Sequence, residues 1–293
     1  MTPQPDLSDV VAIDVHTHVH GSARGAADHV DASTERFYEY FGAEVNITTV
    51  ESLAAYYRER RMMAVAFTVN TETVTGTPPV PSDEEIAELA AANADVIIPF
   101  GTVDPHLNQA AVRRVGELVR LGMRGFKFHP NAQAFNPNDR AFYPIYEAIE
   151  AAGLPALFHT GHTGVGANQQ GGGGIRLKYS NPMFVDDVAV DFPDLTLVLA
   201  HPSFPWQDEA ISVALHKPNV YIDLSGWSPR YFPENLVRYA NTLLRHKVLF
   251  GSDFPMITPD RWLADFEQAA FKDEVRPLIL KENATRVLGL DAP

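Results

Sequence analysis

Short apolar runs rich in β-branched residues recur along the whole chain and alternate with segments of helical periodicity. Runs of this kind predict buried strands, and the segments between them predict helices. The predicted strands are Val10–His18, Met62–Val69, Val96–Val103, Met123–His129, Pro155–His159, Leu195–His201, Val220–Leu224 and Lys247–Gly251. Eight strands that alternate with helices are typical of a parallel (β/α)8 barrel, so we expect an α/β fold of the TIM-barrel type.

The residues at the ends of several helical segments support this alternation. Ser82 and Glu85 form the pattern of a capping box at the start of one helix, and Gly153 is suited to end another. The predicted helices are Val50–Arg61, Ser82–Asn93, Asn108–Leu121 and Tyr143–Ala152. We expect one barrel domain over residues 1–293, with a long polar connection over about 19–48. A connection of that length is unusual unless it has a function.

Composition narrows the chemistry that this chain can perform. Hydrophobic residues make up 45% of its 293 residues, enough for a large core. The chain has no cysteine, so nitrogen and oxygen must hold any metal. A net charge of −14 argues against nucleic-acid and anionic membrane partners, but leaves room for an anionic small molecule. We see no apolar run long enough to cross a bilayer and no signal-peptide pattern, and we expect a cytoplasmic protein.

Histidine and aspartate residues stand where the predicted strands end. His16 and His18 are two positions apart at the end of the first strand, so both imidazoles are expected on one face. His159, His201 and Asp253 follow later apolar runs in the same way. Because active sites of such barrels lie at the carboxyl ends of the strands, closing the barrel is expected to bring these residues together.

These residues, in this order, resemble the amidohydrolase superfamily over nearly the whole chain. Its amidohydrolase-related branch, which includes aminocarboxymuconate semialdehyde decarboxylase, is similar in the segments Gly125–Pro130, Gly251–Pro255 and Leu280–Ala284. A narrower resemblance to hydroxyphenyl β-ketoacyl-CoA hydrolases rests on the loops Phe158–Gly164, His201–Gln207 and Asp223–Trp227. The resemblance implies a metal-dependent hydrolase barrel, and homo-oligomers are frequent among similar proteins.

The resemblance also implies a set of metal ligands. It places four side chains on the metal, with His201 either a further ligand or beside it; the four are His16, His18, His159 and Asp253. Nitrogen and oxygen ligands of this kind suit one zinc ion. Zinc also lowers the pKa of its bound water to about 7, which activates the water. Manganese and iron are also compatible.

Three residues are expected to act on the substrate from the strand ends. Asp253 takes the proton from the metal-activated water, although its position also suits a helix N-cap. Lys127 is either an ammonium that pairs with a carboxylate or polarises the substrate carbonyl, or, less favoured, a carboxylated lysine that bridges two metals. His129 contacts the substrate or supports a ligand, with strand-end packing as its alternative role.

Residues farther along the loops are candidates for substrate contacts. The fifth loop, from Gly171 to Asn181, combines four glycines with Arg176 and Lys178. This composition suits binding of the phosphates of a large anionic substrate such as a CoA thioester. It is equally typical of a flexible surface loop. Trp206 and Trp227 are placed to stack on an aromatic acyl group, or to pack at the rim.

Two reactions are consistent with these expectations. The first is hydrolysis of a carbon–carbon bond in an aryl β-ketoacyl-CoA or related aromatic catabolite, with Asp253, His201 and Lys127 as catalytic residues. The alternative is non-oxidative decarboxylation of an aromatic or muconate-type acid. Against it, no second histidine follows His201, and the first strand has His-x-His where resorcylate-type decarboxylases tend to have Glu-x-His. A catalytically silent barrel is the third hypothesis, and the complete ligand set argues against it.

Overall fold

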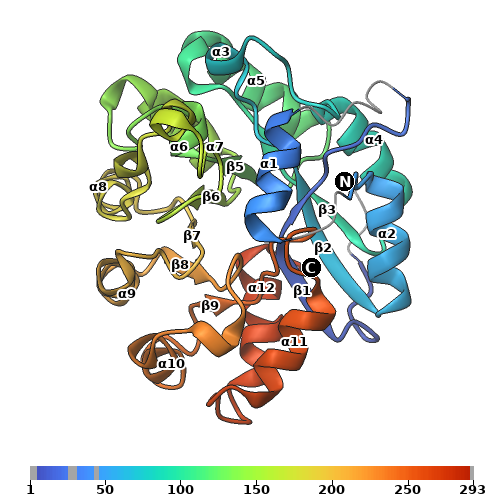
Figure 1. Cartoon of the computed structure of the whole chain (residues 1–293), viewed down its shortest axis with the longest axis vertical. Coiled ribbons are helices and arrows are strands. Elements are labelled where there is room, and N and C mark those ends of the chain that lie inside the picture. The colour runs from blue at the N-terminus through green and yellow to red at the C-terminus, as the bar shows by residue number, and fades with distance from the viewer. Residues whose placement is uncertain (1–4, 26–31, 43–45, 291–293) are drawn as a thin grey trace.

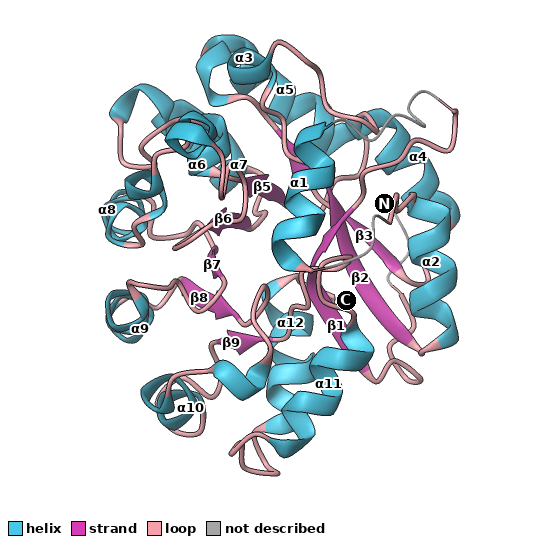
Figure 2. Ribbon diagram, viewed as in Figure 1, coloured by secondary structure: helices cyan, strands magenta, loops and turns pink. Residues whose placement is uncertain are grey.

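The computed structural model describes residues 5–25, 32–42 and 46–290. Its strands are arranged around a central axis, with helices on the outside (Figures 1 and 2). The strands are β1 (Ala12–His18), β2 (Met62–Phe67), β3 (Ile97–Pro99), β4 (Gly101–Thr102), β5 (Phe126–Phe128), β6 (Ala156–His159), β7 (Leu197–Ala200), β8 (Val220–Asp223) and β9 (Val248–Leu249). All are paired in parallel, which confirms the expected (β/α)8 barrel.

The helices follow the strands in the expected alternation. The longer ones are α1 (Ala32–Phe41), α2 (Val50–Glu59), α4 (Asp83–Ala92), α5 (Gln109–Arg120), α7 (Tyr143–Ala151), α8 (Met183–Asp191), α9 (Gln207–His216), α10 (Glu234–Ala240), α11 (Pro259–Gln268) and α12 (Asn283–Val287). Shorter turns of helix are α3 (Glu72–Thr75), α6 (Pro130–Gln133), η1 (Pro105–Leu107), η2 (Arg140–Phe142), η3 (Gln170–Gly174), η4 (Leu177–Ser180), η5 (Pro229–Tyr231) and η6 (Leu278–Glu282). Among the described residues, no helix has the length and apolar character needed to cross a bilayer.

The sheet closes through backbone hydrogen bonds between its first and last strands. Val15 donates to the carbonyl of Phe250 over 3.0 Å, and Asp253 donates to that of His16 over 3.0 Å. On the other side of the barrel, the third predicted strand is split at Phe100 into β3 and β4, and Phe100 donates to Ala66 of β2 over 3.0 Å. The eight strand positions are therefore kept although the third contains a break.

The core lies in two layers on either side of the strands. Inside the barrel, Ile13, Val15 and Leu157 belong to a buried cluster that also includes residues of α12, which covers one end. Outside, residues such as Ala12 and Phe158 pack in a larger cluster with the helices. This alternation along each strand fixes which side chains can reach the barrel interior.

Two local expectations differ from the structure. Ser82 caps α4 by accepting a hydrogen bond from the Glu85 amide, but the Glu85 carboxylate bonds to Ser22 and Ala23 instead of completing the capping box. The connection expected over about 19–48 contains helix α1 among its described residues. Its two sides meet where His20 and Gly21 both donate to the carbonyl of Thr48.

Candidate metal centre and substrate cavity

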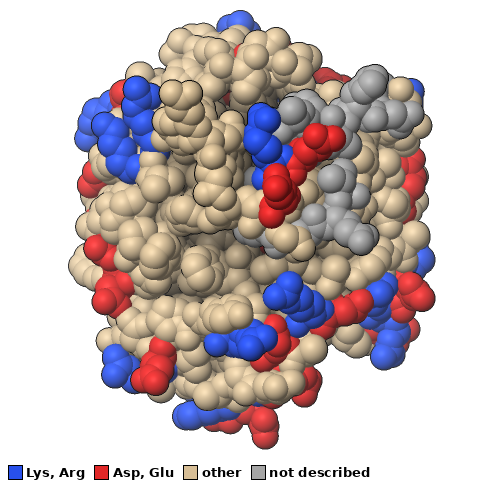
Figure 3. Space-filling view, in the orientation of Figure 1, with Lys and Arg blue, Asp and Glu red and all other residues tan. Residues whose placement is uncertain are grey.

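A cavity of about 820 Å³ opens at the carboxyl ends of the strands. Among the described residues, seven histidines line it: His16, His18, His20, His129, His159, His162 and His201. Tyr38 and Tyr40 of α1 form part of its wall, so this helix lies over the strand ends (Figure 1). In the view of Figure 3 the surface is hollowed near its centre, and most side chains there are uncharged.

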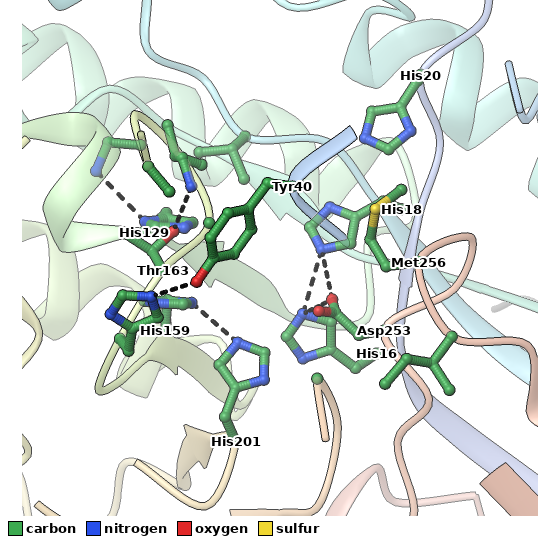
Figure 4. Close-up of a pocket in the computed structure, with 18 of the residues that line it drawn as sticks. His16, His18, His20, Tyr40, His129, His159, Thr163, His201, Asp253 and Met256 are labelled. Atoms are coloured by element: carbon green, nitrogen blue, oxygen red, sulfur yellow. Dashed lines mark hydrogen bonds and ion pairs between the residues drawn. The ribbon is translucent and has the colours of Figure 1, made fainter. Parts of the chain in front are cut away.

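Residues from β1 and the turn after β9 form one half of the candidate centre. Nε2 of His16 lies 3.3 Å from Nε2 of His18, and Oδ1 of Asp253 lies 3.2 and 3.1 Å from these two atoms (Figure 4). A register shift between Asp14 and Thr17 produces this arrangement. Val15 and His16 both face inward although they are consecutive, because the shift resets the alternation of the strand.

The other half comes from β6 and β7. Nε2 of His201 lies 2.9 Å from Nδ1 of His159, and the ring of His159 stacks on that of His129 at 3.9 Å (Figure 4). The ring of His201 also lies 4.9 Å from the ring of His16, which joins the two halves. His201 and Asp253 have φ values of 74° and 70°, in the left-handed region that non-glycine residues rarely adopt. The structure thus brings all five expected ligands to one cavity.

Lys127 and the end of β8 complete the surroundings of His16. Nζ of Lys127 lies 3.1 Å from Nε2 of His16, and the whole lysine side chain is buried. On the other side of the ring, Oδ2 of Asp223 and Oγ of Ser225 each lie 3.0 Å from Nδ1. A carboxylate at Nδ1 favours the tautomer in which Nε2 is free to bind a cation.

Burial and mutual proximity shift the pKa values of these groups. Burial lowers the pKa of Lys127 to about 7 and that of His20 to about 3. The pKa of His16 is held well below its ordinary value, first by burial and then by the Lys127 charge. Burial alone would raise the pKa of Asp253, but the charge of His16 and the hydrogen bond from His18 outweigh it and lower that pKa strongly. At neutral pH the rings of His16 and His20 are therefore neutral and Asp253 is ionised.

These donors fit a divalent cation. Nε2 of His159 is buried and has no hydrogen-bond partner among the described residues. Nε2 of His16 approaches His18, Lys127 and Asp253 within 3.3 Å, more contacts than one ring nitrogen can satisfy by hydrogen bonding. Neutral imidazole nitrogens and a carboxylate are the ligand types that zinc and manganese accept. The residues that could hold such an ion are His16, His18, His159, His201 and Asp253.

The expected substrate contacts are only partly brought to the cavity. His129 and Trp227 line it, and Trp227 also packs against Phe204 with 5.8 Å between ring centroids. Arg176 and Lys178 are exposed and do not belong to its lining, and neither does Trp206, which is half-buried. The cations of the fifth loop are therefore not placed at the cavity wall.

Several residues at the site were not singled out from the sequence. Asp223 is the last residue of β8 and lies near the end of the predicted strand Val220–Leu224, and this signal could have found it. Gly226 has φ of 73°, and a Cβ atom there would lie 2.6 Å from Nδ1 of His201, so only glycine fits. Tyr40 Oη lies 3.0 Å from Nε2 of His162, and no sequence pattern indicates that contact.

Comparison with known proteins supports the architecture. The sequence profile described as amidohydrolase matches residues 13–290. A stretch of 108 residues is 32% identical to protein fluG of Emericella nidulans. This stretch makes up 36% of this chain and 12% of fluG. The chain thus matches a small part of a much longer protein.

Solved structures share the fold over nearly the full length. An uncharacterised TIM-barrel protein of Bordetella bronchiseptica has 25% identity and a TM-score of 0.77, with 95% of this chain and 98% of that chain covered. A 5-carboxyvanillate decarboxylase of Novosphingobium aromaticivorans, complexed with manganese and a nitrobenzoic acid, has 14% identity and a TM-score of 0.67, with 98% of each chain covered. A 2,6-dihydroxybenzoate decarboxylase has 14% identity and a TM-score of 0.68, with 99% and 100% covered.

Proposed function

The chain belongs to the amidohydrolase family of metal-dependent enzymes, and from this premise we propose that it decarboxylates a small aromatic or conjugated carboxylic acid without redox chemistry. The 5-carboxyvanillate and 2,6-dihydroxybenzoate decarboxylases share its fold and act on acids of this kind. Carbon–carbon hydrolysis of an aryl β-ketoacyl-CoA is the second candidate. What favours it is Trp227 in the cavity wall and a volume of about 820 Å³, which exceeds the needs of a single ring.

The observation that carries the proposal is the distribution of charge around the cavity. Among the described lining residues, Lys127 and Arg261 are the lysine and arginine side chains, and Asp253 is the only carboxylate. One buried ammonium beside the histidine cluster suits one carboxylate group of a substrate. The several phosphates of a CoA thioester would need more cations than this wall offers, since Arg176 and Lys178 lie outside it.

A metal bound by the histidine cluster and Asp253 would supply a Lewis acid that orients the substrate and stabilises negative charge. The identity of this metal is open between the zinc that the sequence suggests and the manganese bound by the decarboxylase of Novosphingobium aromaticivorans. Asp223 and Ser225 hold the His16 ring in the orientation that this role requires.

The chain's own groups would perform the remaining steps. Lys127, 3.1 Å from His16, attracts the substrate carboxylate to the floor of the cavity. Asp253 lies beside His16 and His18 at the same floor. It is ionised at rest, so it can take a proton from water and pass it to the ring carbon. The carbon–carboxylate bond then breaks, and the proton takes the place of carbon dioxide. The balance is one acid to one arene and one carbon dioxide, so no redox cofactor is required.

The proposal is tested by measuring carbon dioxide release from a panel of hydroxylated benzoic and muconate-type acids. Metal-stripped protein, protein reloaded with zinc or manganese, and the reloaded D253N variant are compared. We expect release by reloaded wild-type protein and its loss in the other two. Cleavage of 4-hydroxybenzoylacetyl-CoA to 4-hydroxybenzoate, with no release from any acid, would support the hydrolase instead.

A further inference from the structure

A second group of polar atoms lies on the cavity wall beside the candidate metal centre. Nδ1 of His20, Oγ1 of Thr68 and Oγ1 of Thr48 are buried, and none has a hydrogen-bond partner among the residues that the structure describes. His20 and Thr68 line the cavity, whereas Thr48 does not. A buried polar atom without a partner is costly, so a pair of them at a cavity wall points to a ligand that supplies the missing hydrogen bonds.

The fold holds His20 and Thr68 next to each other. His18 pairs with Phe67 in the parallel register of β1 and β2, and Val19 donates to the carbonyl of Phe67 over 3.1 Å. His20 and Thr68 therefore follow neighbouring strands within one residue of the same level. The His20 ring is also stacked on that of His18, with 5.6 Å between centroids and an angle of 2° between planes (Figure 4). Its orientation toward the cavity is thus fixed in the absence of substrate.

The charges near this pair decide what kind of group it can bind. The ionisable groups that act electrostatically on His20 are the carboxylate of Asp253 and the ring of His18. Lys127 is engaged with His16 at 3.1 Å on a different strand. A second substrate carboxylate would be buried here beside Asp253 without a cation, which is unfavourable. A hydroxyl group both donates and accepts, carries no charge, and so matches a threonine hydroxyl and an imidazole nitrogen.

We propose that His20 and Thr68 form a subsite that binds an uncharged hydroxyl substituent of the substrate. The subsite rests on the proposed function in one respect, namely that the acid group of the substrate lies at the histidine cluster. Its consequence is a preference for hydroxylated over unsubstituted acids.

The test is calorimetric binding of benzoate, 3-hydroxybenzoate and 4-hydroxybenzoate to the manganese-loaded full chain. We expect wild-type protein to bind at least one hydroxybenzoate about threefold to tenfold more tightly than benzoate, the range of one neutral hydrogen bond. Thr68→Val keeps the side-chain shape and removes the hydroxyl, and His20→Phe keeps a ring against His18. Each is expected to abolish the preference while benzoate affinity stays unchanged.

Thr48→Val is the matched control, because it removes a neighbouring buried hydroxyl that does not line the cavity. We expect it to keep the wild-type preference. The proposal is overturned if wild-type protein shows no preference, or if T48V and T68V change it equally. Binding does not require turnover. A preference that T68V abolishes therefore supports the subsite even if no acid releases carbon dioxide. The missing release would count against the proposed reaction alone.

Discussion

Oδ2 of Asp223 lies 3.0 Å from Nδ1 of His16, across 207 residues of sequence, and both side chains are buried. The Oδ1 atom of the same carboxylate accepts from the Ser225 amide at 2.8 Å. Asp223 therefore fixes the ring of an expected metal ligand from behind and fixes the turn after β8 at the same time. Contacts of this kind set both the tautomer and the direction of a histidine ligand.

Replacing Asp223 by asparagine is expected to weaken metal binding about 10- to 100-fold. The amide nitrogen at the Oδ2 position donates instead of accepting, which favours the wrong His16 tautomer. Competition with a chelator measures the affinity. The exposed Asp9→Asn change is the control, and an affinity in D223N equal to that of D9N would contradict this role.

Lys127→Met is expected to lower kcat by about 100-fold, the usual effect of removing one buried charge-stabilising group. Methionine fills the buried space beside Phe67, whose ring lies 4.9 Å from Nζ, so the fold should persist. Elemental analysis should give one metal per chain in wild-type and variant protein. Two metals in the wild-type chain and one in K127M would show that the lysine bridges two ions.

Gly226→Ala is expected to destabilise the protein by about 1–3 kcal/mol and to weaken metal binding. The new Cβ atom would lie 2.6 Å from Nδ1 of His201. Gly76→Ala is a matched control, because Gly76 has φ of 76° but no atom within 4 Å of its Cβ position. The difference between the two variants in urea unfolding isolates the collision from the backbone strain. Equal losses in both would show that the collision is absent.

Asp83 predicts a pH dependence of stability that is separate from the site. Burial raises the pKa of Asp83 to about 7, partly offset by the charge of Arg114. The folded state keeps a proton that the unfolded state loses near pH 4, so stability falls as the pH rises toward 7. From pH 5 to 8 Asp83 should contribute about 2.5 kcal/mol to this loss, so D83N should lose less stability than wild-type protein by about that amount. Urea unfolding of both proteins at the two pH values gives the comparison; identical losses would refute the assignment.

The sequence predicts the barrel and the cluster because both depend on strand periodicity. Residues at strand ends converge in any closed parallel barrel, which is why His159, His201 and Asp253 could be placed together. The register shift within β1 could not be predicted, since it depends on pairing with β2 and on closure against the turn after β9. Simple alternation correctly places His16 and His18 on one face. It does not account for Val15 and His16, which are consecutive and both face inward.

Sequence patterns say least about the loops. For Arg176 and Lys178 the sequence leaves two alternatives, contact with substrate phosphates through a glycine-rich segment or a place on a flexible surface loop. In the structure Gly171, Gly172 and Gly173 adopt φ values of 60–63° in a turn, and the two cations point to solvent. Tyr40 reaches His162 from a helix that no apolar periodicity indicated. Loop conformation depends on tertiary contacts, which no local pattern encodes.

The most direct test of the central claim is turnover in deuterium oxide by the manganese-loaded protein, with products identified by mass spectrometry and NMR. For an acid from the panel, we predict equimolar carbon dioxide and an arene with one deuterium at the carbon that carried the carboxylate. Aromatic acids that stay intact, together with cleavage of 4-hydroxybenzoylacetyl-CoA to 4-hydroxybenzoate, would contradict decarboxylation and assign the site to carbon–carbon hydrolysis.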